Sequence, residues 1–173
     1  MERQTRAMHR RTFLATTGLG VAAVGLPRRV AAAEMNEAEK ANLKVINRFL
    51  HIRWNATPID WNEVGQILAE DCVWGTNTTN FTKGREAILK VLKQNFGDGV
   101  PTRHCHVVQQ WANGSIVTNE RYEGTGVGQN GGPPSVAHGV GVFQVKDGKI
   151  KEWRWFGIEN GPGLKAPASA FKP

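Results

Sequence analysis

The sequence predicts an α+β domain in which helices pack against a curved antiparallel sheet. Three helical patterns occur in the first half of the chain, over residues 36–53, 60–68 and 86–96. Four strand-like runs joined by turn signals then follow, over residues 104–111, 115–123, 135–145 and 149–158. A curved sheet of this kind wraps the helices into a cone with one open mouth, and the interior of the cone is a natural ligand pocket.

The helices are each indicated by a start signal and an apolar face. Asn36 is a candidate cap for the first helix, with Glu39 three residues further on. Residues of one apolar face follow at Leu43, Val45, Ile46, Phe49 and Leu50. The second helix is expected to end before 70–71, and a strand to begin at 72–74. The third follows a turn at 83–85 and places four apolar residues inward, namely Ala87, Ile88, Val91 and Leu92.

Turn residues separate the later strands. Asn113-Gly114 predicts a hairpin, because these residue types tolerate positive φ. Residues 146–148 predict a tight turn, and the Gly- and Pro-rich segment 124–134 predicts a loop. The tail from residue 160 onward is expected to be a loop as well.

The first 33 residues have the layout of an export signal. A basic segment containing Arg10-Arg11 precedes an uncharged stretch over 12–27, and small residues follow at 31–33. The arginine pair resembles the twin-arginine motif. A retained transmembrane helix is the alternative, but an uncharged stretch of about sixteen residues is short for a bilayer core that needs roughly 20. We therefore expect cleavage, a bacterial periplasmic location, no stable membrane anchor, and a mature chain beginning at Glu34.

Removing this segment changes the charge argument. The whole chain carries 22 basic and 15 acidic residues, and the segment holds six arginines and one glutamate, so the remainder has 16 and 14. A net charge of +2 argues against a nucleic-acid partner, because such binding needs a concentrated basic face. Two cysteines remain, Cys72 and Cys105, and we expect both to be unpaired and buried.

Three local motifs resemble the NTF2-like superfamily. They are the helix-to-strand segment 69–74, the run Gly84-Arg85-Glu86-Ala87-Ile88, and the closing hairpin 141–150 followed by Trp153-Arg154. The hairpin is similar to the limonene-1,2-epoxide hydrolase branch, alongside the SnoaL-like members. The resemblance implies an NTF2-like cone over 34–160, with three helices packed on a strongly curved antiparallel or mixed sheet, a tail over 161–173, and a homodimer through the open sheet face.

The epoxide hydrolase branch carries an "E-R-x-D" motif on its central strand, and Glu120-Arg121-Tyr122-Glu123 is the matching run. The resemblance implies that Glu123 activates water and that Arg121 orients it or stabilises negative charge. Strand alternation places both side chains on one face. The family's second acid, in "W-R-D", is replaced by Trp155. The alternative for Glu123 and Arg121 is a buried ion pair that only holds the sheet.

Other polar and aromatic residues are further candidates for the site. His106 or His138 could replace the missing acid or base. His104 and His106 have a spacing that could suit a metal, but no third ligand stands at a suitable offset, so we expect neither metal nor cofactor. Candidate substrate contacts are Trp54, Trp74, Asn77, Trp153 and Trp155. For any single tryptophan, core packing is the alternative.

Together these features predict an exported enzyme with a deep apolar pocket that acts on a small hydrophobic or aromatic molecule. Its chemistry would be cofactor-free and acid–base, with epoxide hydrolysis as the named reaction. A lyase, dehydratase or isomerase acting on an aromatic or terpenoid substrate would need the same kind of pocket. A non-catalytic periplasmic binder of small hydrophobic ligands is the alternative from another class.

Overall fold

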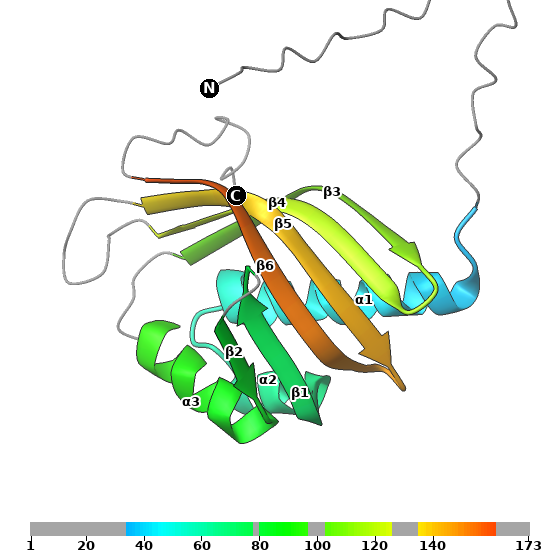
Figure 1. Ribbon diagram of the computed structural model, residues 1–173, viewed down its shortest axis with the longest axis horizontal. Helices are drawn as coiled ribbons and strands as arrows, with labels where there is room; N and C mark the ends of the chain where they lie inside the picture. The colour runs from blue at the N-terminus through cyan, green and yellow to red at the C-terminus, as the bar shows by residue number, and fades with distance from the viewer. Residues whose placement is uncertain (1–33, 78–79, 97–102, 126–134, 162–173) are drawn as a thin grey trace, which may run out of the picture. The chain divides into compact units, whose positions relative to one another are not determined.

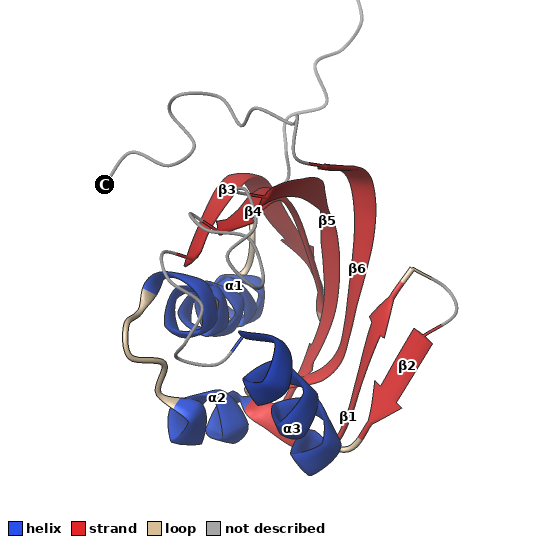
Figure 2. Ribbon diagram, turned by 90° about the vertical axis from the view of Figure 1, so that its left-hand side faces the viewer, coloured by secondary structure: helices blue, strands red, loops and turns tan. Residues whose placement is uncertain are grey.

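The computed structural model describes residues 34–77, 80–96, 103–125 and 135–161. The predicted export signal, residues 126–134 of the loop predicted over 124–134, and the tail from 162 lie outside the described residues. The described part is a six-stranded mixed sheet that curls around the helices (Figures 1 and 2). The expected α+β architecture, with helices packed against a curved sheet, is confirmed.

The sheet has the strand order β2-β1-β6-β5-β4-β3. Its strands are β1 (Leu68–Thr76), β2 (Asn80–Lys83), β3 (Arg103–Asn113), β4 (Ile116–Thr125), β5 (Ser135–Lys146) and β6 (Lys149–Gly161). The last four strands form an antiparallel meander, as expected from the turn signals. The return of β6 to β1 is the one parallel pairing among the described strands, and it makes the sheet mixed.

The helices cover one face of the sheet (Figure 2). They are α1 (Glu37–Leu50), the π-helix η1 (His51–Asn55), α2 (Trp61–Ile67) and α3 (Arg85–Phe96). The start of α1 is fixed by the expected capping box between Asn36 and Glu39. Glu39 also accepts a hydrogen bond from the backbone of Gly114, so the same carboxylate ties α1 to the β3–β4 hairpin.

Several elements differ from the sequence expectation. Strand β4 runs to Thr125 and β6 to Gly161, so 124–125 and 160–161 are strand and not loop. Strand β1 begins at Leu68 and not at 72, because Leu68 pairs with Ile150 of β6 and is fully buried. Strand β2 was not expected at all. Its residues are mostly exposed and show no apolar alternation, and the strand forms by pairing with β1.

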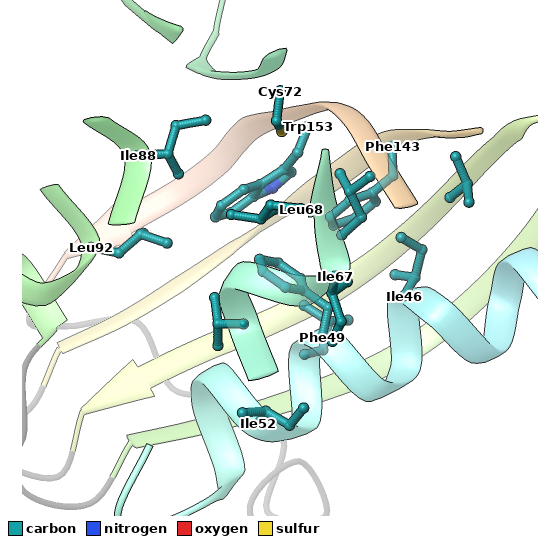
Figure 3. Close-up of a cluster of buried hydrophobic side chains, with 14 of the residues drawn as sticks. Ile46, Phe49, Ile52, Ile67, Leu68, Cys72, Ile88, Leu92, Phe143 and Trp153 are labelled. Carbon is teal, nitrogen blue, oxygen red and sulfur yellow. The ribbon is translucent and has the colours of Figure 1, made fainter. Parts of the chain in front are cut away.

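The core lies between the helices α1, α2 and α3 and the sheet (Figure 3). Phe49 of α1 meets Trp153 edge-on at a centroid distance of 5.1 Å, and Phe143 lies parallel to Trp153 at 6.0 Å. Burying one such side chain contributes roughly 1.5–3 kcal/mol. Trp153 therefore belongs to the packing that joins α1 to β5 and β6.

None of the helices in the described part of the chain is both long and apolar enough to cross a bilayer.

Candidate functional site

Strand β4 supplies the polar residues that face the helices. Asn119 and Arg121 are fully buried, and Glu123, two residues further on, has a side chain only 12% exposed. Alternation along the strand turns the intervening residues to the other face. A row of three polar residues thus runs along the inner surface of the sheet, and Gln110 of β3 stands opposite Asn119 at one end of it.

Arg121 and Glu123 form the central contact of this row. The Nε of Arg121 donates to Glu123 Oε1 at 2.8 Å, and Nη2 lies 2.8 Å from the same oxygen, outside hydrogen-bond alignment. Arg53 approaches the same Oε1, with its Nη1 at 4.0 Å. Within the described part of the chain, no side chain forms a hydrogen bond or an ion pair with the other carboxylate oxygen, Oε2. One carboxylate oxygen is therefore anchored, and the other is not held by any of the described residues.

Asn119 holds the opposite end of the Arg121 guanidinium. Its Oδ1 accepts a hydrogen bond from Nη1 of Arg121 at 2.5 Å. The guanidinium is thus fixed at both ends by residues two positions away on its own strand. Asn119 was not among the residues selected from the sequence, because an asparagine in a strand carries no signal of its own.

Two glycines of β5 make this arrangement possible. A Cβ on Gly141 would stand 1.8 Å from Nη1 of Arg121, so the guanidinium crosses β5 where a side chain is missing. A Cβ on Gly139 would stand 2.7 Å from the ring of Trp155. Arg121 and Trp155 belong to strands on either side of β5, yet the guanidinium lies 4.3 Å from the ring centroid. Trp155 thus packs on the arginine of the expected motif.

Arg53 is a second buried cation that the sequence analysis did not select. It is 2% exposed, and its guanidinium lies 4.4 Å from the ring of Trp54 and 5.0 Å from that of Trp153. Burial lowers the pKa of Arg53 to about 10, although the Glu123 carboxylate opposes this shift. The π-helical turn of η1 carries the arginine toward the sheet. A sequence pattern gives no sign of such a turn.

The same turn fastens the edge of the sheet. Asn55, the last residue of η1, accepts a hydrogen bond from the backbone N–H of Cys105 at 2.8 Å and donates to its carbonyl at 3.2 Å. Cys105 stands opposite Glu123 in the β3–β4 register. Both cysteines are free thiols, as expected. Cys72 is fully buried, but Cys105 is only partly buried, which differs from the expectation that both are buried.

The expected aromatic contacts divide into two groups. Trp54 and Trp153 are almost fully buried, and Trp153 stacks on the half-buried Trp74 at a centroid distance of 5.3 Å. Trp155 is half-buried beside Arg121. Asn77 is exposed at a positive φ of 55°, and its backbone N–H donates to the carbonyl of Trp155. The structure thus assigns Asn77 a role in joining β1 to β6.

The two candidate histidines lie on the opposite face of the sheet from Glu123. His106 and His138 both stand opposite Tyr122, which is adjacent to Arg121 and therefore points the other way. The ring of His138 stacks on Tyr122 at 4.3 Å, and its Nε2 lies 2.9 Å from Oε1 of Glu120. Neither histidine can replace the missing acid beside Glu123, which corrects that expectation. Among the described residues, no group of three ligating side chains could hold a metal ion.

A comparison with protein families matches a SnoaL-like domain over residues 46–153. No curated protein gives a significant sequence match. The matched family segment contains Arg53, the whole polar row of β4 and both β5 glycines. It ends at Trp153, two residues before Trp155.

Solved structures show the same fold. An LEH-like epoxide hydrolase from M. tuberculosis has a TM-score of 0.59 and 22% identity, covering 69% of this chain and 84% of that one. A protein named as a SnoaL-like polyketide cyclase from Jannaschia sp. CCS1 has a TM-score of 0.60 and 17% identity, covering 72% and 90%. A protein named as a ketosteroid isomerase from Kribbella flavida has a TM-score of 0.58 and 17% identity, covering 78% of this chain and 90% of that one. The fold is NTF2-like, and identities this low carry the fold alone.

Proposed function

The chain belongs to the SnoaL-like domain family, and we propose that it is an exported small-molecule enzyme that uses Glu123 as a general base without a cofactor. The contacts of Glu123 carry this proposal. Arg121 and Arg53 both face Oε1, and Oε2 takes part in no contact with the described residues. A base needs a fixed position and a free lone pair, and this carboxylate has both.

Arg121 acts by holding the base in place. Its side chain is fully buried and fixed at both ends, by Glu123 and by Asn119. A donor that is already fixed needs no reorganisation when charge develops in the transition state, and this lowers the barrier. Because a guanidinium group is not deprotonated in proteins, the arginine stabilises charge and does not act as the acid.

Two reactions are compatible with this base. In the epoxide-hydrolase form, Oε2 of Glu123 takes a proton from water while the water oxygen bonds to an epoxide carbon. The ring C–O bond then breaks, and the released oxygen takes its proton from solvent water. In the other form, Oε2 takes a proton from a carbon next to a carbonyl group, as an isomerase, dehydratase or lyase requires. Trp155 favours the second form, because its ring packs on Arg121 where the epoxide hydrolase branch carries a second acid. Proton removal from carbon needs no such acid beside the base.

The Glu123→Gln variant tests this proposal. We expect the full chain to convert styrene oxide to its diol, or to exchange the α-protons of phenylacetone for deuterium in D2O. Loss of a general base lowers rates by about 10²- to 10⁴-fold, and the isosteric glutamine keeps an amide oxygen that can accept the hydrogen bond from Arg121. Glu70→Gln is the matched control, since the Glu70 side chain is 88% exposed. Equal rates for Glu123→Gln and the unmodified chain would refute the role of Glu123.

A non-catalytic binder of small hydrophobic molecules is the second candidate. The tryptophans packed around the buried arginines favour it, because indole rings hold apolar ligands as well as substrates. A binder would change its tryptophan fluorescence with naphthalene or limonene while giving no product from either probe substrate. Detectable turnover that depends on Glu123 excludes this candidate.

Export is part of the proposal and rests on the segment around Arg10-Arg11. We expect expression of the full chain in a bacterium to yield a periplasmic protein whose N-terminus is Glu34. Lysine in place of both arginines should keep the chain in the cytoplasm. Recovery of an uncleaved chain in the periplasm, measured by intact mass, would contradict the proposed cleavage.

We also propose that the mature chain is a homodimer through the exposed sheet surface. Three large apolar residues of β3 and β4 are well exposed there, namely Val108 (48%), Trp111 (47%) and Ile116 (39%). Sedimentation equilibrium should give twice the mass of one mature chain, and Trp111→Glu should give a single chain. A monomer at micromolar concentration would contradict this assembly.

A further inference from the structure

Asn119 carries a buried hydrogen-bond donor with no acceptor. Arginine can only donate, so the amide oxygen of Asn119 must face Nη1 of Arg121. The amide nitrogen, Nδ2, is then directed elsewhere, and it has no hydrogen-bond partner although Asn119 is fully buried. A buried donor without an acceptor destabilises a folded protein, so its presence here points to a ligand.

The neighbouring Arg121 has unused donor capacity as well. Its Nε–Nη2 edge faces Glu123, but Nη2 makes no aligned hydrogen bond. Each terminal guanidinium nitrogen carries two N–H groups, and Nη1 uses only one on Asn119. The end of the guanidinium between Nη1 and Nη2 therefore presents donors next to the amide of Asn119.

Most other buried polar atoms nearby that lack a hydrogen-bond partner are donors as well. Among the described residues of β1, β3, β4 and β6, the N–H donors of this kind are Trp74 Nε1, Asn119 Nδ2, Arg121 Nη2 and Trp153 Nε1. The one acceptor of this kind in the same described strands is Oε1 of Gln110, which stands opposite Asn119 in the β3–β4 register. A surface with an excess of donors suits a ligand rich in acceptors. The indole rings of the same region suit an apolar or aromatic body.

The charges of the buried arginines also favour a negatively charged ligand. The guanidinium groups of Arg53 and Arg121 both face one oxygen of one carboxylate. The positive charge of Arg121 adds to burial in lowering the pKa of Arg53. A second negative charge at the donor end of Arg121 would favour both cations, because it compensates charge in a region screened from water.

We propose that the substrate carries a carboxylate on an aromatic or apolar body, and that Asn119 Nδ2 and the free end of Arg121 bind this carboxylate. The inference rests on the proposed function in that it takes the surface around Glu123 as the ligand site. Exposure along the inner face of β4 begins at Glu123, so the ligand enters from that end. Its carboxylate then lies beyond Glu123, at the opposite end of the guanidinium.

Binding of two matched probes tests the inference without turnover. Sodium benzoate and benzamide have the same size and ring, but only benzoate is charged. Titration of the full chain, followed by calorimetry and tryptophan fluorescence, should give a Kd for benzoate about tenfold lower than that for benzamide, as charge-assisted hydrogen bonds require. Equal affinities, or no binding of benzoate at millimolar concentration, would overturn it.

The Asn119→Asp variant locates the carboxylate. It keeps the shape and the contact with Arg121, but replaces the Nδ2 donor with a negatively charged oxygen. We expect benzoate to bind this variant at least about tenfold more weakly than it binds the unmodified chain. The affinity for benzamide should fall by a smaller factor. Asn113→Asp adds the same charge at an exposed site in the β3–β4 hairpin and is the control. An unchanged benzoate Kd in Asn119→Asp would overturn the assignment.

The two proposals fail separately. If Glu123→Gln keeps its turnover while benzoate remains the preferred ligand, the proposed base is wrong and the ligand class stands. If turnover depends on Glu123 but benzoate has no preference over benzamide, the base stands and the carboxylate inference is wrong. The comparison of benzoate with benzamide needs no variant, so it decides even if Asn119→Asp does not fold.

Discussion

The guanidinium of Arg121 occupies the space that a side chain at Gly141 would need. The distance between Nη1 and the position of a Cβ on Gly141 is 1.8 Å, well inside van der Waals contact. The same guanidinium reaches Trp155 on the far side of β5. Gly141 therefore sets the position of Arg121, and through it the position of Glu123.

Gly141→Ala should displace Arg121 and weaken the fold. Forcing a methyl group into filled space costs about 1–3 kcal/mol, and the displaced arginine no longer holds Glu123. We expect urea unfolding to show this loss of stability, and turnover to fall with it. Gly65→Ala in α2 is the control: its Cβ would meet only the end of Leu89, at 3.3 Å, and alanine favours a helix by roughly 0.5–1 kcal/mol. Equal stabilities for the two variants would contradict this account.

The two partners of the central ion pair should differ in their effect on stability. Glu123→Leu leaves the buried Arg121 without its carboxylate and facing Arg53, which should cost about 3–5 kcal/mol. Arg121→Met should cost less, because Glu123 keeps Arg53 as a partner at 4.0 Å. Chemical denaturation measures both values.

The double variant Arg121→Met with Glu123→Leu provides the control for this pair. Replacing both partners with apolar residues removes the uncompensated charge, so the double variant should be more stable than Glu123→Leu alone. Additive losses would show that the two side chains do not interact energetically.

Strand periodicity explains how much of this site the sequence could predict. The i, i+2 spacing of Arg121 and Glu123 places them on one face, and the structure has them there because β4 is regular at that point. The same rule, applied to Tyr122, would have placed His106 and His138 on the other face. That step needed the pairing register, which depends on where each hairpin turns.

Strand periodicity does not predict the roles of Arg53 and Gly141, for two different reasons. Arg53 reaches the site through a π-helical turn, which no local pattern indicates. The pair Gly139 and Gly141 does carry a signal, since glycines in a strand mark a close approach. The sequence does not say which side chain makes that approach, because the arginine comes from a neighbouring strand.

Asn55→Ala should loosen the edge strand β3 near the site. Asn55 makes two hydrogen bonds to the backbone of Cys105, and each contributes about 0.5–1.5 kcal/mol. We expect a loss of roughly 1–3 kcal/mol in the free energy of unfolding and faster amide exchange at Cys105. Asn95→Ala, at an exposed position of α3, is the control. Unchanged exchange at Cys105 would show that β3 holds its edge without Asn55.

The two thiols report on their burial through their protonation, Cys105 on the edge strand β3 and Cys72 on β1. Burial raises the pKa of both Cys72 and Cys105 to about 12. Because a raised pKa favours the protonated form, the stability that each thiol contributes is complete below about pH 9 and is lost as the pH rises toward about 12. At pH 8 we expect iodoacetamide to alkylate both about a thousandfold more slowly in the native protein than in guanidinium.

The thiols also test the Asn55 contact independently. In Asn55→Ala, the backbone of Cys105 loses its two partners, so local opening should expose this thiol and raise its alkylation rate by about tenfold or more. Cys72 lies on β1, away from η1, and should react as slowly as before. Peptide mass spectrometry separates the two sites in one sample. Equal acceleration at both cysteines would indicate global destabilisation, and it would refute a local role for Asn55.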